Sequence, residues 1–298
     1  MGERQTEIVS GVAAGVPFTA LPPAVPAGGP APLVLTWHMI DAPRTDAAFA
    51  AALPLAGVPA WRVHLGMPLC GARMADGSMD AVVARAIEDA VLSYAAPFVR
   101  QAVDELPAAL ADLRERLPVD DGPIGVVGGS LGGAVALRVL AERRIPVAAA
   151  AVVNAAVRAR SLVALIEGLT EQPYRWTDEA AQAAADLDFV ARSGDIAGGP
   201  AQPPLLLVSG EQDYPTFRAD TAELAAALRG RYRRPDDVRL ITVPDLAHPL
   251  AEPPGVEPAP QLPQATAVDA EITAWFRHHL VSSGRTDHTE ESVSDGTT

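Results

Sequence analysis

The residues of this chain that could perform covalent chemistry centre on Ser130, in the pattern Gly128-Gly-Ser-Leu-Gly132. An apolar run over 124–127 precedes the pattern, and apolar residues at helical spacing follow it over 135–140. This order predicts a strand, a sharp turn and a helix, with the serine hydroxyl pushed clear of the sheet. Glycines two positions before and after the serine remove side chains that would collide in such a turn. Ser130 is therefore a candidate nucleophile.

A glycine-rich turn between a strand and a helix can also serve only for packing, or hold a phosphate. The nucleotide-binding versions need Gly-x-Gly-x-x-Gly or Gly-Lys-Ser/Thr, and neither follows the strand here. A serine hydroxyl is a weak nucleophile unless a histidine takes its proton and an acid orients that histidine. The other polar residues must therefore decide between these interpretations.

His248 is the predicted base, because it lies in a loop after the last predicted strand, 238–243, at the sheet edge expected to hold Ser130. The chain has six histidines. The other five lie in or beside upstream strands, on the terminal helix or in the tail: His38, His64, His278, His279 and His288.

Asp213 is the predicted orienting acid, because it follows the predicted strand 205–209 by four residues. Glu211 is closer to the strand end, and Asp245 is next to the histidine loop. Asn154, after the strand 145–153, occupies the other common acid position and is no acid. The resulting order of serine, aspartate and histidine is the one expected for an α/β hydrolase.

The elements that must position these residues alternate between apolar strands and helices. Strands are predicted as a pair within 5–22 and over 33–37, 59–65, 124–127, 145–153, 205–209 and 238–243. Helices are predicted from a cap at Thr45 or Asp46 to about 55, over 79–95, 98–117, 161–169, 178–192, 218–229 and 268–280, and after Ser130. This alternation predicts a mostly parallel, doubly wound sheet with helices on both faces.

Residues 155–200 interrupt the alternation and predict a small helical, cap-like insertion in a single domain over 1–280. Two of the eight Tyr and Trp residues, Tyr174 and Trp176, lie in it. They either form a wall of the substrate pocket or pin the insertion to the core. Residues 281–298 are polar and acidic, which predicts a disordered tail.

Composition excludes several classes of partner. The chain of 298 residues has 23 basic and 37 acidic residues, and its net charge of −14 disfavours nucleic acid and anionic membranes. It has one cysteine, Cys70, and no run of about 18 apolar residues. We expect a cytoplasmic protein that acts on a small molecule without a metal or organic cofactor. The composition does not indicate an oligomeric state.

The chain resembles the α/β hydrolases, and within them the branch of the dienelactone hydrolases and the prolyl-oligopeptidase catalytic domains. The resemblance covers about 6–280 and rests on the glycine pattern around Ser130, the Gly-x-x-Asp ending at Asp213, and His248. It implies an oxyanion hole formed by the backbone N–H groups of Leu131 and Met39. Many relatives have glycine at the position of Met39. A methionine there narrows the conformations of the loop that carries the second oxyanion donor, the N–H of Met39.

These observations predict a serine hydrolase that cleaves a carboxylic ester or related acyl substrate through an acyl-enzyme. A dedicated oligopeptidase is less expected, since relatives that cut peptides usually carry a β-propeller, for which this chain has no room. One alternative keeps the same three residues and passes the acyl group to an acceptor other than water, as an acyltransferase, thioesterase or cyclase does. The other is a catalytically silent relative that only binds a ligand, and the intact residues argue against it.

Overall fold

The central strands are buried on both faces, and their side chains alternate between two apolar cores. In β3 (Leu33–Trp37), Leu33 and Leu35 contact one core and Val34 contacts the other. The same alternation recurs along the neighbouring strands. Strands of this kind are typical of a parallel sheet that helices cover on both faces.

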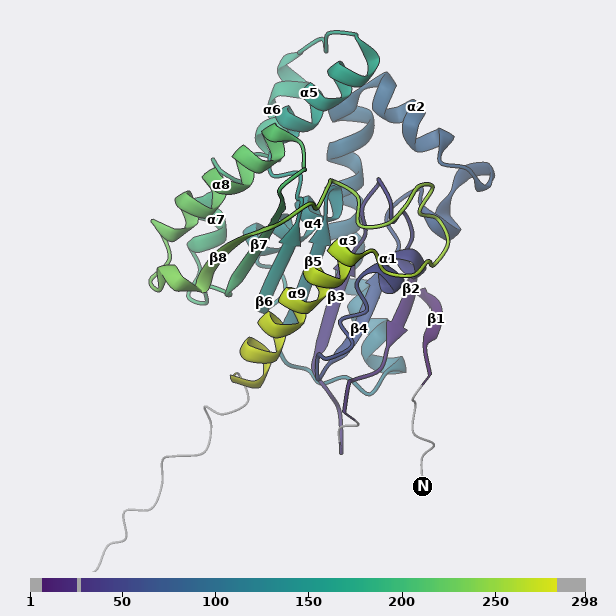
Figure 1. Cartoon of the computed structure of the whole chain (residues 1–298), viewed down its shortest axis with the longest axis vertical. Helices are drawn as coiled ribbons and strands as arrows, with labels where there is room; N and C mark the ends of the chain where they lie inside the picture. Colours follow the sequence, from purple (N-terminus) through teal and green to yellow (C-terminus); the bar gives the residue numbers. More distant parts are fainter. Residues whose placement is uncertain (1–6, 26–27, 283–298) are drawn as a thin grey trace, which may run out of the picture.

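The computed structural model describes residues 7–25 and 28–282, which form one sheet of eight strands (Figure 1). The other strands are β1 (Val9–Ala13), β2 (Val16–Leu21), β4 (Trp61–Leu65), β5 (Ile124–Gly129), β6 (Val147–Val153), β7 (Leu205–Gly210) and β8 (Val238–Val243). Their order is β1-β2-β4-β3-β5-β6-β7-β8. β2 pairs antiparallel with both β1 and β4, and every later pair in this order is parallel. The predicted, mostly parallel sheet is confirmed.

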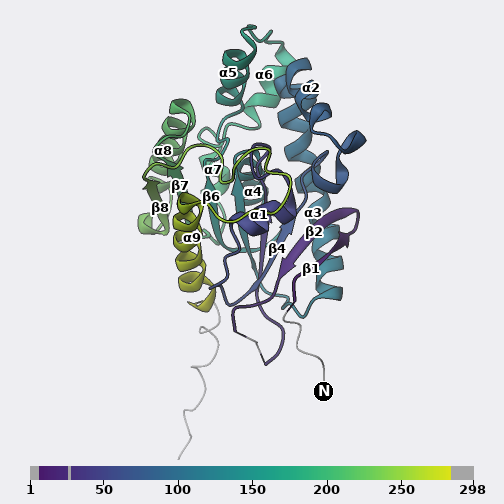
Figure 2. The same ribbon diagram turned by 45° about the vertical axis from the view of Figure 1, so that its right-hand side comes forward.

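Helices cover both faces of this sheet. One face packs against α1 (Asp46–Ala52) and α9 (Pro263–Ser282). The other packs against α3 (Ala96–Arg116), α4 (Leu131–Glu142), α7 (Ser193–Ala197) and α8 (Pro215–Arg229). Three further helices, α2 (Asp80–Glu88), α5 (Ala159–Thr170) and α6 (Asp178–Ala185), lie beyond the end of the sheet, at the top of Figures 1 and 2.

The helix predicted over 79–95 is interrupted at Asp89. The backbone of Asp89 is extended, with φ −157°, and one oxygen of its carboxylate accepts hydrogen bonds from the N–H groups of Val91 and Leu92. An aspartate that caps the backbone in this way ends one helix and starts the next. A short π-helix, η3 (Ala90–Ala95), therefore follows α2 and leads into α3. At α1, Thr45 is the cap, and its hydroxyl accepts the N–H of Ala48.

The predicted insertion over 155–200 has two parts. Helices α5 and α6 lie beyond the sheet edge, whereas α7 packs against α4 and α8. Helix α9 continues to Ser282, two residues into the predicted tail. Residues 283–298 lie outside the described part. Among the described residues, no helix combines the length and the apolar character needed to cross a bilayer.

Candidate active site

Ser130 lies in a strained turn between β5 and α4, with φ 50° and ψ −118°. A non-glycine residue at positive φ carries strain that the surrounding structure must hold. The flanking glycines allow this turn. A Cβ on Gly128 would overlap the carbonyl oxygen of Gly132, and one on Gly132 would overlap that of Trp37. The turn therefore requires both glycines.

The side chains of Ser130, His248 and Asp213 meet at the carboxyl edge of the sheet, after β5, β8 and β7. The Oγ of Ser130 is 2.9 Å from Nε2 of His248, and Nδ1 of His248 is 2.7 Å from Oδ1 of Asp213. A carboxylate only accepts hydrogen bonds, so Nδ1 carries the imidazole hydrogen and Nε2 accepts the serine hydroxyl. The structure thus brings together the three residues that the sequence singled out.

Burial and aromatic rings hold the imidazole in place. Ser130, Asp213 and His248 are 7%, 3% and 6% exposed. The rings of Tyr214 and Phe217 lie with their centroids 5.0 and 5.3 Å from that of His248. The same oxygen of Asp213 also accepts the N–H of Tyr214 at 2.7 Å, which orients the carboxylate.

The two alternative acids stay away from this cluster. Glu211 and Asp245 are both exposed, and the Glu211 carboxylate accepts the N–H of Asp245 at 3.3 Å. Their hydrogen bond ties the loop after β7 to the loop after β8. Within the described part of the chain, neither side chain forms a hydrogen bond with His248.

Asn154 is a fourth side chain that holds this site, and the sequence did not identify its contacts. It is completely buried after β6, and its Nδ2 donates to the carbonyls of Ala247 at 2.8 Å and His248 at 3.0 Å. Its Oδ1 accepts the N–H of Gly210 at 2.7 Å. The side-chain amide of Asn154 therefore joins the end of β7 to the backbone of the histidine loop. This link uses both the donor and the acceptor of the amide, which a carboxylate could not supply.

Two backbone N–H groups lie free beside the serine. Among the described residues, neither Leu131 nor Met39 donates its N–H to a partner. The loop after β3 packs on the first turn of α4, since a Cβ on Gly132 would lie 2.5 Å from the carbonyl oxygen of His38. The N-terminus of α4 also favours negative charge at this point.

The departure at Met39 is accommodated without strain. Met39 is not among the residues with positive φ, so its backbone conformation does not require glycine. Its buried side chain joins the core on the face of α1, and its Cγ would lie only 2.8 Å from a Cβ on Gly129. The methionine therefore fills space that the absence of a side chain at Gly129 leaves open.

His38 holds the backbone of the Met39 loop. Its Nε2 accepts the N–H of Met67 at 2.9 Å, so its Nδ1 carries a hydrogen and donates to the carbonyl of Met39 at 2.5 Å. Complete burial lowers the pKa of His38 to about 4, which keeps the ring neutral and this hydrogen-bond pattern intact at neutral pH.

A cavity of about 400 Å³ opens above the serine. Ser130, His248 and Tyr214 line its inner end, and Asp41 and Arg44 of the loop after β3 add charged groups. Its outer walls are apolar side chains of α2 and α5. An apolar pocket with a few convergent polar groups is the usual form of a small-molecule site.

Tyr174 and Trp176, predicted either to wall the substrate pocket or to pin the insertion, are not among the residues that line this cavity. Their rings pack edge to face at 4.8 Å, and the Tyr174 hydroxyl donates to Asp89 at 2.6 Å. The guanidinium of Arg160 lies 4.1 Å from the Trp176 ring centroid. The alternative interpretation, that they pin the insertion, agrees with these contacts.

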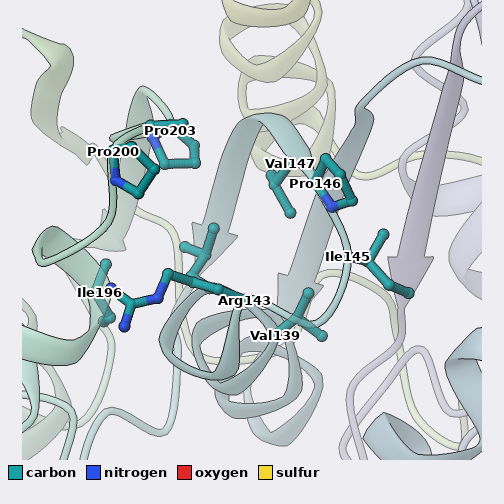
Figure 3. A pocket seen from close by; sticks show the side chains of 10 residues that line it. Val139, Arg143, Ile145, Pro146, Val147, Ile196, Pro200 and Pro203 are labelled. Atoms are coloured by element: carbon teal, nitrogen blue, oxygen red, sulfur yellow. The ribbon is translucent and has the colours of Figure 1, made fainter.

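A second pocket of about 200 Å³ lies at the opposite, amino end of β6, between α4 and the segment before β7 (Figure 3). Its lining is apolar, with Arg143 as the charged member, and contains no residue that could act as a nucleophile or base. Within the described residues, no group of three or more His, Cys, Asp or Glu could hold a metal ion.

The parallel sheet with its strained serine turn defines an α/β hydrolase, and the chain is a serine hydrolase of that class. Residues 100–282, more than half of the chain, match the prolyl oligopeptidase family. The chain belongs to that family. The match includes Ser130, Asp213 and His248.

Solved structures share the fold over nearly the whole chain. TT1662 from Thermus thermophilus is 20% identical with a TM-score of 0.61, and the match covers 91% of this chain and 98% of that one. Carboxyl esterase 2 from the fungus Tuber melanosporum is 19% identical with a TM-score of 0.57, covering 92% and 86%. The acylaminoacyl peptidase of Pyrococcus horikoshii is 13% identical with a TM-score of 0.62, covering 97% of this chain and 43% of that one. No curated protein matches the sequence.

Proposed function

We propose that this protein hydrolyses carboxylic esters of small molecules through an acyl-enzyme on Ser130. The observation that carries the proposal is the continuous hydrogen-bonded chain from Ser130 through His248 to Asp213, opening into one cavity. A hydroxyl, an imidazole and a carboxylate in this order are the parts that nucleophilic acyl transfer needs. The likeness to a carboxyl esterase supports the choice of an ester.

In the first half-reaction, Ser130 Oγ attacks the ester carbonyl carbon and its proton moves to Nε2 of His248. The oxyanion that forms accepts hydrogen bonds from the N–H groups of Leu131 and Met39. As the intermediate collapses, the bond to the alcohol oxygen breaks and His248 returns the proton to that oxygen. Asp213 keeps the imidazole in the required tautomer and stabilises its charged form.

In the second half-reaction, water attacks the acyl-serine and gives one proton to His248. The carboxylic acid leaves, and Ser130 regains its proton. An alcohol or thiol that replaced water would turn the same site into a transferase. Product analysis in the presence of added alcohol measures how the acyl group is divided between the two acceptors.

The test is labelling with a fluorophosphonate probe together with turnover of p-nitrophenyl acetate, compared with the matched p-nitroanilide. We expect Ser130→Ala to lose labelling and turnover. Ser209→Ala is the control, because Ser209 is buried to the same extent, at 6% exposed, in β7. We expect the wild type to cleave the ester much faster than the anilide. Labelling at another serine, or faster cleavage of the anilide, would contradict the proposal.

A further inference from the structure

The outer walls of the cavity are two apolar helix stripes that face each other. On the side of α2, the lining residues are Met79, Val82, Val83, Ala86 and Ile87. Their spacing of three and four residues places them on one face of the helix. A stripe of this kind normally packs on the core, but only Val82 is buried among the residues of α2.

The stripe on α5 has the same spacing. Leu162, Leu165, Ile166 and Leu169 line the cavity from the opposite side. Both helices lie beyond the carboxyl edge of the sheet, at the top of Figures 1 and 2, and they contact each other. The two stripes therefore form an elongated apolar cleft, which we call the α2–α5 cleft, and its inner end is at Ser130 and His248.

The exposed apolar side chains of the protein concentrate at the outer end of this cleft. Among the described residues, six large apolar side chains are exposed. Three of them line the cleft: Val83 at 49%, Ile87 at 63% and Leu169 at 73%. Exposed apolar surface that continues a pocket marks a site for an apolar ligand.

We infer that the α2–α5 cleft binds an extended apolar chain of the ester substrate, so that the enzyme selects medium-chain esters over acetyl esters. The inference rests on the proposed ester hydrolysis. The cleft and the reacting serine share one cavity, so a chain attached to the scissile group enters the cleft without leaving the site. The stripe from Leu162 to Leu169 is about 10 Å long at the rise of an α-helix, which sets the length of chain it can cover.

The chain could belong to the acyl group or to the alcohol, and two substrate series distinguish these sources. The first is p-nitrophenyl acetate, butyrate, hexanoate and octanoate, and the second is the acetates of the corresponding alcohols. We expect kcat/KM to rise by about three- to fourfold for each buried methylene in one of the series. The series that shows the rise identifies the part of the substrate in the cleft.

Ile87→Ser tests the assignment to this cleft. We expect it to lower kcat/KM for the longest ester of the responsive series by roughly tenfold, with the acetyl ester and fluorophosphonate labelling little changed. Ile8→Ser is the matched control: Ile8 is 65% exposed, close to the 63% of Ile87, and does not line the cleft. Because both side chains are exposed, neither change should unfold the protein.

Several outcomes would overturn the inference while leaving the hydrolase function standing. One is turnover that does not depend on chain length in either series. Another is a length dependence that Ile87→Ser and Ile8→Ser leave equally intact. A third is a wild-type dimer that Ile87→Ser converts to a monomer without altering chain-length preference, since the cleft would then bind a second copy. Loss of all labelling and ester turnover in the wild type would instead refute the proposed function.

Discussion

The Nδ2 group of Asn154 donates a hydrogen bond at 3.0 Å to the backbone carbonyl of His248, 94 residues later in the chain. The imidazole of that histidine bonds to Ser130 and Asp213. The amide of Asn154 thus fixes the backbone of the histidine loop, while the aspartate fixes the ring. A small shift of this backbone would misalign the proton transfer that we propose.

We predict that Asn154→Asp lowers kcat by roughly 10- to 100-fold, the scale expected for misplaced reacting groups. The carboxylate would face the carbonyls of Ala247 and His248 with no hydrogen to donate. Aspartate tolerates the positive φ of 45° at this position, so the backbone is spared. Steady-state kinetics with a thermal melt tests this. Near-normal kcat with only a lower Tm would mean that Asn154 stabilises the fold without positioning the histidine.

Exchange of Asp213, the proposed orienting acid, should lower activity far more. We expect Asp213→Asn to lower kcat by about three to four orders of magnitude, because an amide can hold the imidazole in the wrong tautomer. Asp245→Asn is the control: Asp245 is exposed at φ 56°, which asparagine tolerates, and it should retain a near-normal rate. The reverse result would assign the orienting role to Asp245.

Two buried histidines outside the proposed triad should make stability depend on pH. Burial lowers the pKa of His38 to about 4 and that of His64 to about 3, from an ordinary value near 6.5. Between these values the unfolded chain binds protons that the native state does not, so stability falls as pH decreases below about 6.5 and is level above it. Each histidine accounts for roughly 1.5 kcal/mol between pH 6.5 and 5, because the unfolded imidazole is already half protonated at pH 6.5.

Urea unfolding at pH 5 and 7.5 measures this loss. In the wild type, the hydroxyl of Thr36 lies 2.8 Å from Nδ1 of His64. His64→Asn keeps a polar nitrogen near this hydroxyl and removes one titrating group. We expect the variant to show about half of the pH-dependent loss attributed to the two histidines. If the free energy of unfolding of the variant changed between pH 7.5 and pH 5 by as much as that of the wild type, His64 would be excluded as a source of the pH dependence.

The aromatic pair in the insertion should affect stability and not substrate choice. Trp176→Ala removes an edge-to-face contact with Tyr174 and the stacking of Arg160, a loss of about 1 kcal/mol. This lowers Tm by roughly 2 to 4 °C for a chain of this size. Calorimetry and the ester series together test the prediction. An altered chain-length ranking at unchanged Tm would return Trp176 to the substrate pocket.

The sequence alone was enough for the fold and for the three residues of the proposed triad. Both depend on local signals, since apolar strands followed by turns specify a parallel sheet, and the carboxyl ends of such strands share one edge. Ser130, Asp213 and His248 lie one, three and five residues after the ends of β5, β7 and β8, so their meeting at one sheet edge did not require knowledge of side-chain packing.

Only the tertiary structure identified the contacts of Asn154 and the α2–α5 cleft. The hydrogen bonds of Asn154 join β6, β7 and the histidine loop across long separations in sequence, and no local pattern encodes them. The apolar spacing of α2 and α5 predicts amphipathic helices, but it does not say whether their stripes meet the core or each other. The hydrogen bond from Tyr174 to Asp89 is also a long-range contact that the sequence does not reveal. The sequence allowed Tyr174 either to line the substrate pocket or to pin the insertion, and this contact favours the second role.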